Sequence, residues 1–162
     1  MSHKVRIRAA AILIHEDKIL LNEFDNGKYY NFPGGGLEAN ETLKQAVARE
    51  VMEEAGLTIE VGDLVFTLEY EPKSSNCKHG ESGRISMFFR CYLNTEMPPK
   101  PITLPDVNPD DPSVISKAKW IPISEISRLN TLVSPVNEQL INYIKTGSFV
   151  PSFVETHILE AK

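Results

Sequence analysis

The stretch from Gly34 to Leu57 constrains the fold more than any other part of the chain. It opens with three consecutive glycines and continues into a run of residues with helical spacing. Thr42 and Gln45 have the spacing of a capping box, in which two residues satisfy each other's backbone N–H groups at the start of a helix. Gly56 can adopt the left-handed conformation that ends a helix. The sequence therefore predicts a glycine loop and then a helix between Thr42 and Gly56.

The predicted helix concentrates its negative charge on one side. At about 100° per residue, Glu50, Glu53 and Glu54 fall within an arc of about 100°. Arg49 can reach Glu53 or Glu41, but one guanidinium cannot neutralise all of these carboxylates, which otherwise repel one another. We expect the opposite side of the helix to face the core; it carries Ala48, Val51, Met52 and Ala55.

Two readings of this acidic arc are open, a solvated surface and a metal site. Clusters that offer only oxygen atoms suit Mg²⁺ or Mn²⁺, which go with phosphate substrates. The glycines after Pro33 let the backbone approach a ligand closely. Apolar residues one turn earlier on the glutamate side place the acids at the mouth of a packed region; these are Leu43, Ala46 and Val47. The pattern therefore favours the metal site.

The same residues carry a family resemblance. They follow the spacing G-x5-E-x7-R-E-U-x-E-E-x-G-U, where U is aliphatic, and resemble the box of the Nudix hydrolases at every fixed position: Gly35, Glu41, Arg49, Glu50, Val51, Glu53, Glu54, Gly56 and Leu57. The resemblance implies hydrolysis of a nucleoside diphosphate linked to another group, by attack of water on a phosphorus.

It also implies a role for each box residue. Glu50, Glu53, Glu54 and the carbonyl oxygen of Gly35 would hold Mg²⁺ or Mn²⁺, and Arg49 would pair with Glu41 to orient the helix. Glu53 is the first choice for the general base. Some members of the family take this base from a distal loop, for which the chain offers Glu96, Asp106, Asp110 and Asp111.

The remaining segments alternate between strand and helix patterns. Strands are predicted at Val5–His15, Lys18–Phe24, Tyr29–Pro33, Thr58–Glu71, Ile85–Leu93 and Lys117–Pro122, with a hairpin turn at Glu16-Asp17. Loops are predicted at Pro72–Gly83 and Asn94–Ser116, a short capped helix at Ser124–Leu129, and a final helix from Ser134 to about Gly147. This order resembles the Nudix fold, an α/β (α+β) class with a mixed sheet between helices in an α/β/α arrangement. We expect a single domain over residues 1–162.

Composition limits the environment and the partners. A chain of 162 residues with 41% hydrophobic and 24% charged residues suits one globular domain. A net charge of −5 argues against nucleic-acid or anionic-membrane partners. No apolar stretch approaches a membrane span and no signal peptide is evident. Cys77 and Cys91 lack metal-ligand spacing and are expected to be free thiols in the cytoplasm.

Several residues outside the helix are candidates for substrate contact. Arg84 and Arg90 fall on one face of a predicted strand and could clamp phosphate, although surface pairing is an equal alternative. Tyr30 could stack on a base, although an aromatic residue in a strand is more often part of a core. The roles of Glu38, Pro72 and His79 stay open.

Three functional classes fit such a chain to different degrees. The leading class is a metal-dependent pyrophosphohydrolase of a nucleotide sugar such as ADP-ribose or of a (deoxy)nucleoside triphosphate. The alternative is a nucleotide-sensing Nudix module without turnover, which often lacks some of the acids that this chain keeps. An RNA 5′-end processor is disfavoured by the acidic charge.

The C-terminal tail, residues 147–162, is too apolar for a free tail. We predict an extended segment that packs on its own sheet edge or on a second subunit, with a lean towards a homodimer.

Overall fold

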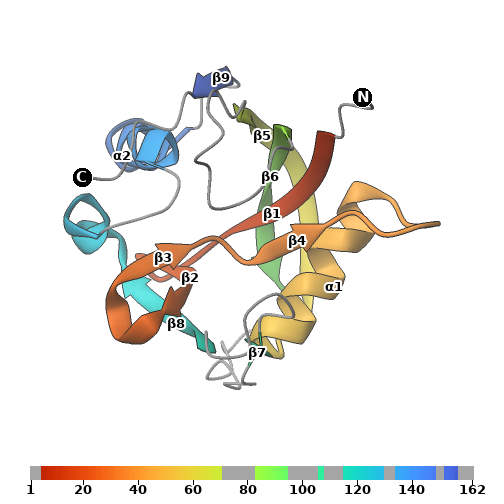
Figure 1. The fold of residues 1–162 in the computed structure, drawn as a ribbon. Helices are drawn as coiled ribbons and strands as arrows, with labels where there is room; N and C mark the ends of the chain where they lie inside the picture. The colour runs from red at the N-terminus through yellow and green to blue at the C-terminus, as the bar shows by residue number, and fades with distance from the viewer. Residues whose placement is uncertain are drawn as a thin grey trace.

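The computed structural model describes residues 5–70, 83–94, 106–107, 115–129, 134–148 and 152–156 (Figure 1). Its strands are β1 (Val5–His15), β2 (Lys18–Phe24), β3 (Tyr29–Asn31), β4 (Gly34–Gly36), β5 (Ile59–Tyr70), β6 (Gly83–Leu93), β7 (Asp106–Val107), β8 (Ile115–Pro122) and β9 (Ser152–Thr156). The helices are α1 (Leu43–Ala55) and α2 (Ser134–Thr146), with short 3₁₀ helices η1 (Asp25–Gly27) and η2 (Ile123–Arg128).

The described strands form one mixed sheet. Its main order is β7-β8-β2-β1-β6-β5-β9, with β3 paired to β2 and β4 paired to β1. The pairs β1–β6 and β5–β9 are parallel, and the other pairs are antiparallel. Glu16 and Asp17 have φ of 46° and 59°, as a tight two-residue hairpin turn requires. The predicted hairpin is therefore confirmed.

Strands β1 and β2 part soon after their hairpin. They are paired only at Ile14–Ile19 and His15–Lys18. Farther from the turn, β1 pairs with β4 and β2 pairs with β3. The short strands β3 and β4 thus fill the opening between the two diverging strands, and β4 brings the glycines beside the first half of β1.

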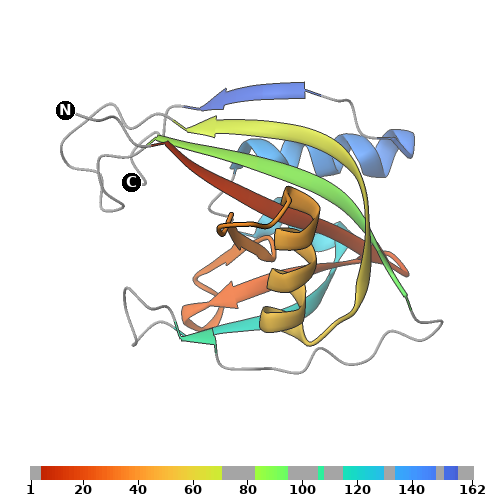
Figure 2. The same cartoon turned by 90° about the vertical axis from the view of Figure 1, so that its right-hand side faces the viewer.

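Helices cover both faces of the sheet, with α1 on one side and α2 on the other (Figures 1 and 2). The side chains of β1 alternate accordingly. Ala9, Ala11 and Leu13 pack in the cluster that includes α1, while Ala10 and Ile12 pack in the cluster that includes Ile126 of η2 and Leu140 of α2. Burial on both faces explains the unbroken apolar run in β1. The predicted mixed sheet between helices is confirmed.

Three local predictions are wrong. The glycines expected in a loop form β4, because their backbone pairs with Arg8, Ala9 and Ala10 of β1. The segment expected as a capped helix at Ser124–Leu129 is the 3₁₀ helix η2, which follows Pro122 and has no side-chain cap.

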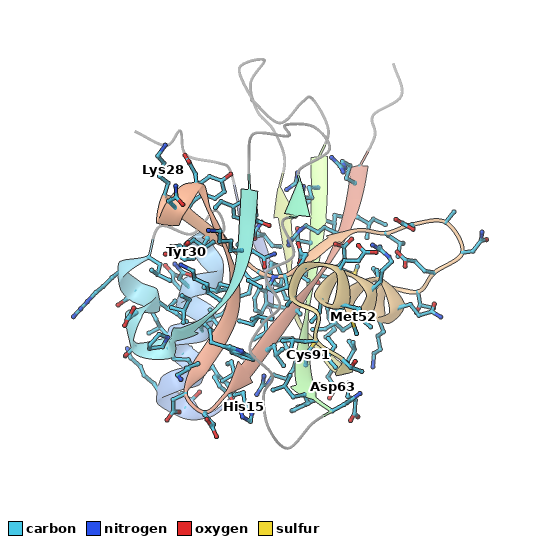
Figure 3. All side chains as sticks on the ribbon, turned by 90° about the horizontal axis from the view of Figure 1, so that it is seen from below. His15, Lys28, Tyr30, Met52, Asp63 and Cys91 are labelled. Carbon is cyan, nitrogen blue, oxygen red and sulfur yellow. The ribbon has the colours of Figure 1, made fainter. Side chains whose placement is uncertain are left out.

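The third concerns Met52, expected in the core but 44% exposed (Figure 3). The buried side of α1 is rotated towards the glutamates and consists of Ala46, Val47, Val51, Glu54 and Ala55.

The last helix ends where the sequence predicts. Gly147 has φ of 71° and its N–H donates to the Tyr143 carbonyl oxygen at 2.7 Å. The chain then returns as β9, which lies parallel to β5 at the edge of its own sheet. Of the two places open to the tail, the described part takes the first, and the homodimer stays a prediction. In the described parts of the chain, no helix is long and apolar enough to cross a membrane.

Candidate active site

The helix α1 is fixed at both ends by the signals in its sequence. The Gln45 N–H donates to Thr42 Oγ1 at 3.3 Å, and the Thr42 N–H donates to Gln45 Oε1 at 2.7 Å. At the other end Gly56 has φ of 64° and donates its N–H to the Met52 carbonyl oxygen at 2.9 Å. The predicted capping box and terminating glycine are therefore present. They hold the glutamates of the last two turns in a defined position beside β4.

Glu54 is buried between α1 and β4. Only 9% of the residue is exposed, and its Oε2 accepts the Gly34 N–H at 2.9 Å. Burial raises the pKa of Glu54 to about 8, although a hydrogen bond with Asn22, the charge of Arg8 and the Gly34 N–H all act to lower it. The groups around Glu54 therefore stabilise its ionised form by less than burial destabilises it.

Glu50 lies against Gly35. A Cβ atom built on Gly35 would collide with the carboxyl carbon and both carboxylate oxygens of Glu50. A side chain at this position would therefore displace the Glu50 carboxylate, so the glycine lets Glu50 lie against the strand. Burial also raises the pKa of Glu50, while the hydrogen bond and charge of Arg49 act in the opposite direction.

Arg49 lies among the other acids of the box. Its Nε and Nη2 donate to the two carboxylate oxygens of Glu41 at 3.0 and 2.7 Å. Its Nη1 donates to Glu50 Oε1 at 2.7 Å and to Glu53 Oε2 at 3.4 Å, and Nη2 also donates to the Gly36 carbonyl oxygen at 3.2 Å. The expected pairing with Glu41 is present, and one side chain joins α1, β4 and the connection between them.

The hydrogen bonds that Arg49 donates lower the pKa of Glu41, and the same bonds to Glu41 and Glu50 raise the pKa of Arg49. The three glutamates that are metal-ligand candidates differ in how exposed they are to solvent. Glu54 is buried, Glu50 has a side chain that is 15% exposed, and the Glu53 side chain is 59% exposed. The three glutamates that the sequence places on one arc of the helix therefore differ in exposure, from the buried Glu54 to the exposed Glu53.

The donor atoms of the candidate site are of the chemical type that a hard divalent cation prefers. It offers carboxylate oxygens and, from β4, backbone carbonyl oxygens, which Mg²⁺ and Mn²⁺ prefer. Burial raises the pKa of Glu54 and of Glu50, so the protein itself does not fully stabilise the ionised form of either carboxyl group. Within the described ranges, no three His, Cys, Asp or Glu side chains are gathered closely enough to hold an ion as they stand.

The structure separates the two arginines predicted to clamp phosphate. Arg84 lines a pocket beside Gly35 and Gly36. Arg90 instead donates to the carbonyl oxygens of Ile12, Ile14 and Cys91, and its guanidinium lies 5.8 Å from the centre of the Tyr143 ring. Arg90 therefore ties β6 to β1 and α2, and it does not line that pocket.

Tyr30 also has a packing role in the structure. Its hydroxyl donates to Glu23 Oε2 at 3.1 Å, and its ring packs on the cluster that includes η2 and α2, away from α1 (Figure 3). Glu38 donates its N–H to Glu41 Oε1 at 2.8 Å, and its own carboxylate is 3.8 Å from Arg49.

Some candidates lie outside the described residues; these are Pro72, Cys77, His79, Glu96, Asp110 and Asp111. Asp106 is described only as part of the backbone of β7. The other cysteine, Cys91, is a buried free thiol whose pKa burial raises to about 12.

Sequence reasoning missed residues of β1 and β2 that border the box. Arg8 donates through Nη2 to the carbonyl oxygens of Phe32 and Gly34, each at 2.8 Å, and so fixes β4 from the side opposite α1. Asn22 is 1% exposed and hydrogen bonds with Glu54. The available signals were arginines at alternate positions of β1 and a lone amide in the apolar run of β2.

Comparison with known proteins gives consistent matches. The model of the NUDIX domain matches residues 5–143. A phosphatase NudJ from Shigella boydii is 28% identical over 152 residues, which cover 91% of this chain and 88% of that protein. A MutT-like protein from Streptomyces ambofaciens is 36% identical over 87 residues, which cover 52% of this chain and 50% of that protein's length.

Solved structures share the architecture. A NUDIX hydrolase from Nitrosomonas europaea superposes with a TM-score of 0.64 at 25% identity, covering 91% of this chain and 93% of that one. An ADP-ribose pyrophosphatase from Streptococcus suis superposes with a TM-score of 0.59 at 21% identity, covering 92% and 98%. The second likeness concerns the fold alone.

Proposed function

Because the chain belongs to the NUDIX family and is one of its pyrophosphohydrolases, we propose that it uses Mg²⁺ or Mn²⁺ to cleave the pyrophosphate linkage of a nucleoside diphosphate derivative. The proposed metal ligands are Glu50, Glu53, Glu54 and the carbonyl oxygen of Gly35. A small nucleotide is the proposed substrate, either a nucleotide sugar such as ADP-ribose or a (deoxy)nucleoside triphosphate.

The observation that carries the proposal is the under-compensated charge beside β4. Two carboxyl groups, Glu50 and Glu54, are held against the glycine strand with their pKa raised by burial. The glycines of β4, which carry no side chains, form the wall beside these two carboxyl groups. Such a wall lets a phosphate group come close to the acids.

A bound divalent metal would neutralise pyrophosphate charge and bring the pKa of bound water towards neutrality. The residues of the chain divide the remaining work. The Gly34 N–H fixes the carboxylate of Glu54, and Arg49 fixes Glu41 and the start of the box. Glu53 is the proposed general base, supported by its position as the most exposed of the three metal-ligand candidates.

The alternative is a sensing module that binds nucleotides without turnover. Complete retention of the box acids favours the enzyme, because a sensor has no need of a base at Glu53. We also propose that the enzyme acts in the cytoplasm without nucleic-acid or membrane partners. The homodimer is tested by light scattering of the full chain, with a chain truncated after Gly147 for comparison. A full chain that scatters as a monomer at micromolar concentration refutes it.

The function is tested with a panel of nucleoside triphosphates, nucleotide sugars and dinucleoside polyphosphates, assayed with Mg²⁺ and with Mn²⁺. The readout is the nucleotide product, separated from the substrate by anion-exchange chromatography. We expect turnover of at least one class, its loss in EDTA, and its recovery when metal is restored. Turnover that survives EDTA overturns the metal mechanism, while tight nucleotide binding without turnover supports the sensing alternative.

A further inference from the structure

A single amide side chain lies in the buried part of β2. Asn22 is 1% exposed, and the three residues before it, Ile19, Leu20 and Leu21, are buried apolar side chains. Polar side chains are seldom buried this completely unless their polar atoms have hydrogen-bond partners, because an unmade hydrogen bond costs free energy. The presence of an asparagine at this position therefore needs a physical reason.

The geometry of the sheet directs Asn22 towards α1. Leu20 packs in the core cluster that contains Val51 of α1, and so does Ala118, the antiparallel partner of Asn22 on β8. Residues two positions apart on a strand leave the sheet on the same side, so Asn22 leaves it on the side of Leu20. The carboxamide therefore extends from β2 into the layer between the sheet and α1, where it meets the carboxyl group of Glu54.

Two different strands donate hydrogen bonds to the carboxyl group of Glu54. The Gly34 N–H of β4 donates to Glu54 Oε2 at 2.9 Å, and Asn22 of β2 supplies a hydrogen bond from its side chain. An ionised carboxylate only accepts hydrogen bonds, at about four lone-pair positions, so the group of Asn22 that bonds to it is the Nδ2 amide. The two protein donors thus leave further lone pairs of Glu54 for a cation.

The oxygen of the same amide is left without a partner. Within the ranges that the structure describes, Asn22 Oδ1 is buried and accepts no hydrogen bond. A buried acceptor without a partner is unfavourable for folding, and a leucine, which has nearly the same shape, would avoid this cost. Packing of β2 alone would therefore favour an apolar residue, whereas the contact with Glu54 requires the amide.

We propose that Asn22 is a positioning residue of the candidate metal site, which fixes the Glu54 carboxylate beside β4 and so raises the affinity of the site for a divalent cation. This inference rests on the proposed function, in which Glu54 is a metal ligand. A carboxylate held by donors from two strands cannot rotate freely, so less freedom is lost when a cation binds. Without Asn22, only the Gly34 N–H remains of these two donors, and the carboxylate can turn about that single hydrogen bond.

Binding of Mn²⁺ to the full chain tests the inference without substrate, with electron paramagnetic resonance of the free ion as the readout. The variant is Asn22→Leu, and the matched control is Ser116→Ala, a buried polar residue on the same face of the neighbouring strand β8. We expect the Kd for Mn²⁺ to rise about tenfold or more in Asn22→Leu and not in the control, because hydrogen-bond partners of metal ligands contribute roughly this much affinity.

The outcomes of this titration separate the inference from the proposed function. Equal Kd values for the wild type and Asn22→Leu overturn the role of Asn22 and leave the metal site standing. No binding of Mn²⁺ by the wild type refutes the metal site itself, and the role of Asn22 with it.

Melting curves in EDTA distinguish positioning from folding. We expect Asn22→Leu to melt within about 3 °C of the wild type, because the leucine fills the same space and removes the unpaired oxygen. A large fall in melting temperature together with an unchanged Mn²⁺ affinity would make Asn22 a purely structural residue and overturn the inference.

A measurement on the unaltered protein decides the question even if Asn22→Leu does not fold. The side-chain Nδ2 protons of Asn22 are followed by NMR of the isotopically labelled full chain while Mg²⁺ is added. We expect their resonances to shift together with the backbone N–H of Glu54, and the side-chain amide of Asn26, at an exposed position of η1, to stay unchanged. If the Glu54 N–H shifts while the Asn22 protons do not, the inference is wrong.

Discussion

The two sides of the glycine strand β4 carry opposite charges and are built in different ways. On the α1 side, the metal-ligand candidates come from one helix, and Arg49 hydrogen bonds to two of them, Glu50 and Glu53, and to Glu41 just before the helix. On the other side, the arginines that line the pocket beside β4 come from β1 and β6 and meet only because these strands pair. The acidic side is therefore local in sequence and can be read as a motif, whereas the basic side exists only in the folded sheet.

This difference separates two tasks. The acidic side would hold the metal and the reacting pyrophosphate, whatever group is attached to it. The basic side holds β4 in place, because Arg8 donates to the carbonyl oxygens of Phe32 and Gly34. Substitutions on the acidic side should therefore affect the chemical step for every substrate.

The largest expected effect is on the acidic side. We predict that Glu53→Gln and Glu54→Gln each lower kcat by about a hundredfold or more for every substrate that the enzyme turns over, because each removes charge that stabilises the transition state. Glu60→Gln, at an exposed position of β5, is the matched control. Steady-state kinetics measure the effect. A loss confined to one substrate class would place recognition, and not chemistry, on this side.

A smaller effect is expected when the Arg49 guanidinium, which links the acidic residues, is removed. Arg49→Ala leaves the carboxylates of Glu41, Glu50 and Glu53 without their shared partner. We predict a fall in melting temperature of about 3–6 °C, from a loss of roughly 1–2 kcal/mol of stability.

The control for this melt is Lys28→Ala, which breaks an ion pair with Asp25 whose two side chains are 74% and 50% exposed. Exposed ion pairs contribute little stability, so this variant should melt within about 2 °C of the wild type. If Arg49→Ala also melts like the wild type, Arg49 has no structural role in the box.

The sequence predicts the acidic side well for a physical reason. Capping by Thr42 and Gln45, termination at Gly56 and the contact of Arg49 with Glu53 are interactions within a few residues, so their spacing carries the information. The depth of Glu54 is harder to foresee. It depends on where β1 and β4 lie against the helix, which rotates the buried face away from Met52.

The basic side and the sheet edges depend on contacts between distant segments. Arg6 and Arg84 become neighbours through a parallel pairing that no local pattern specifies. The same holds for β4, whose glycines have little strand propensity and are extended because β1 supplies their hydrogen bonds. It also holds for β9, whose composition predicts an extended segment but not its partner β5.

The pH dependence of stability gives the most specific test of the acidic side. The pKa of Glu54 is about 8 in the folded protein, against an ordinary value of 4.5. Between these values the folded state keeps a proton that the unfolded chain has lost, so stability falls as pH rises through this window.

We predict that the EDTA-treated wild type loses melting temperature from pH 5 to pH 8.5 relative to Glu54→Gln, which lacks this titration. The charges of Glu50 and Glu54 interact, so the difference reports the titration of Glu54 together with its effect on Glu50. Thermal melts in EDTA across this range measure it. Parallel curves for the two proteins would show that Glu54 is not buried as the structure places it.

The central claim is that the carboxylates beside β4 hold a divalent cation. Titration of the protein with Mn²⁺, followed by electron paramagnetic resonance of the free ion, tests it without substrate or turnover. We predict that the wild type binds Mn²⁺, that Glu54→Gln weakens the binding at least tenfold, and that Glu60→Gln does not. Equal Mn²⁺ binding by the wild type and Glu54→Gln, or none by the wild type, would contradict it.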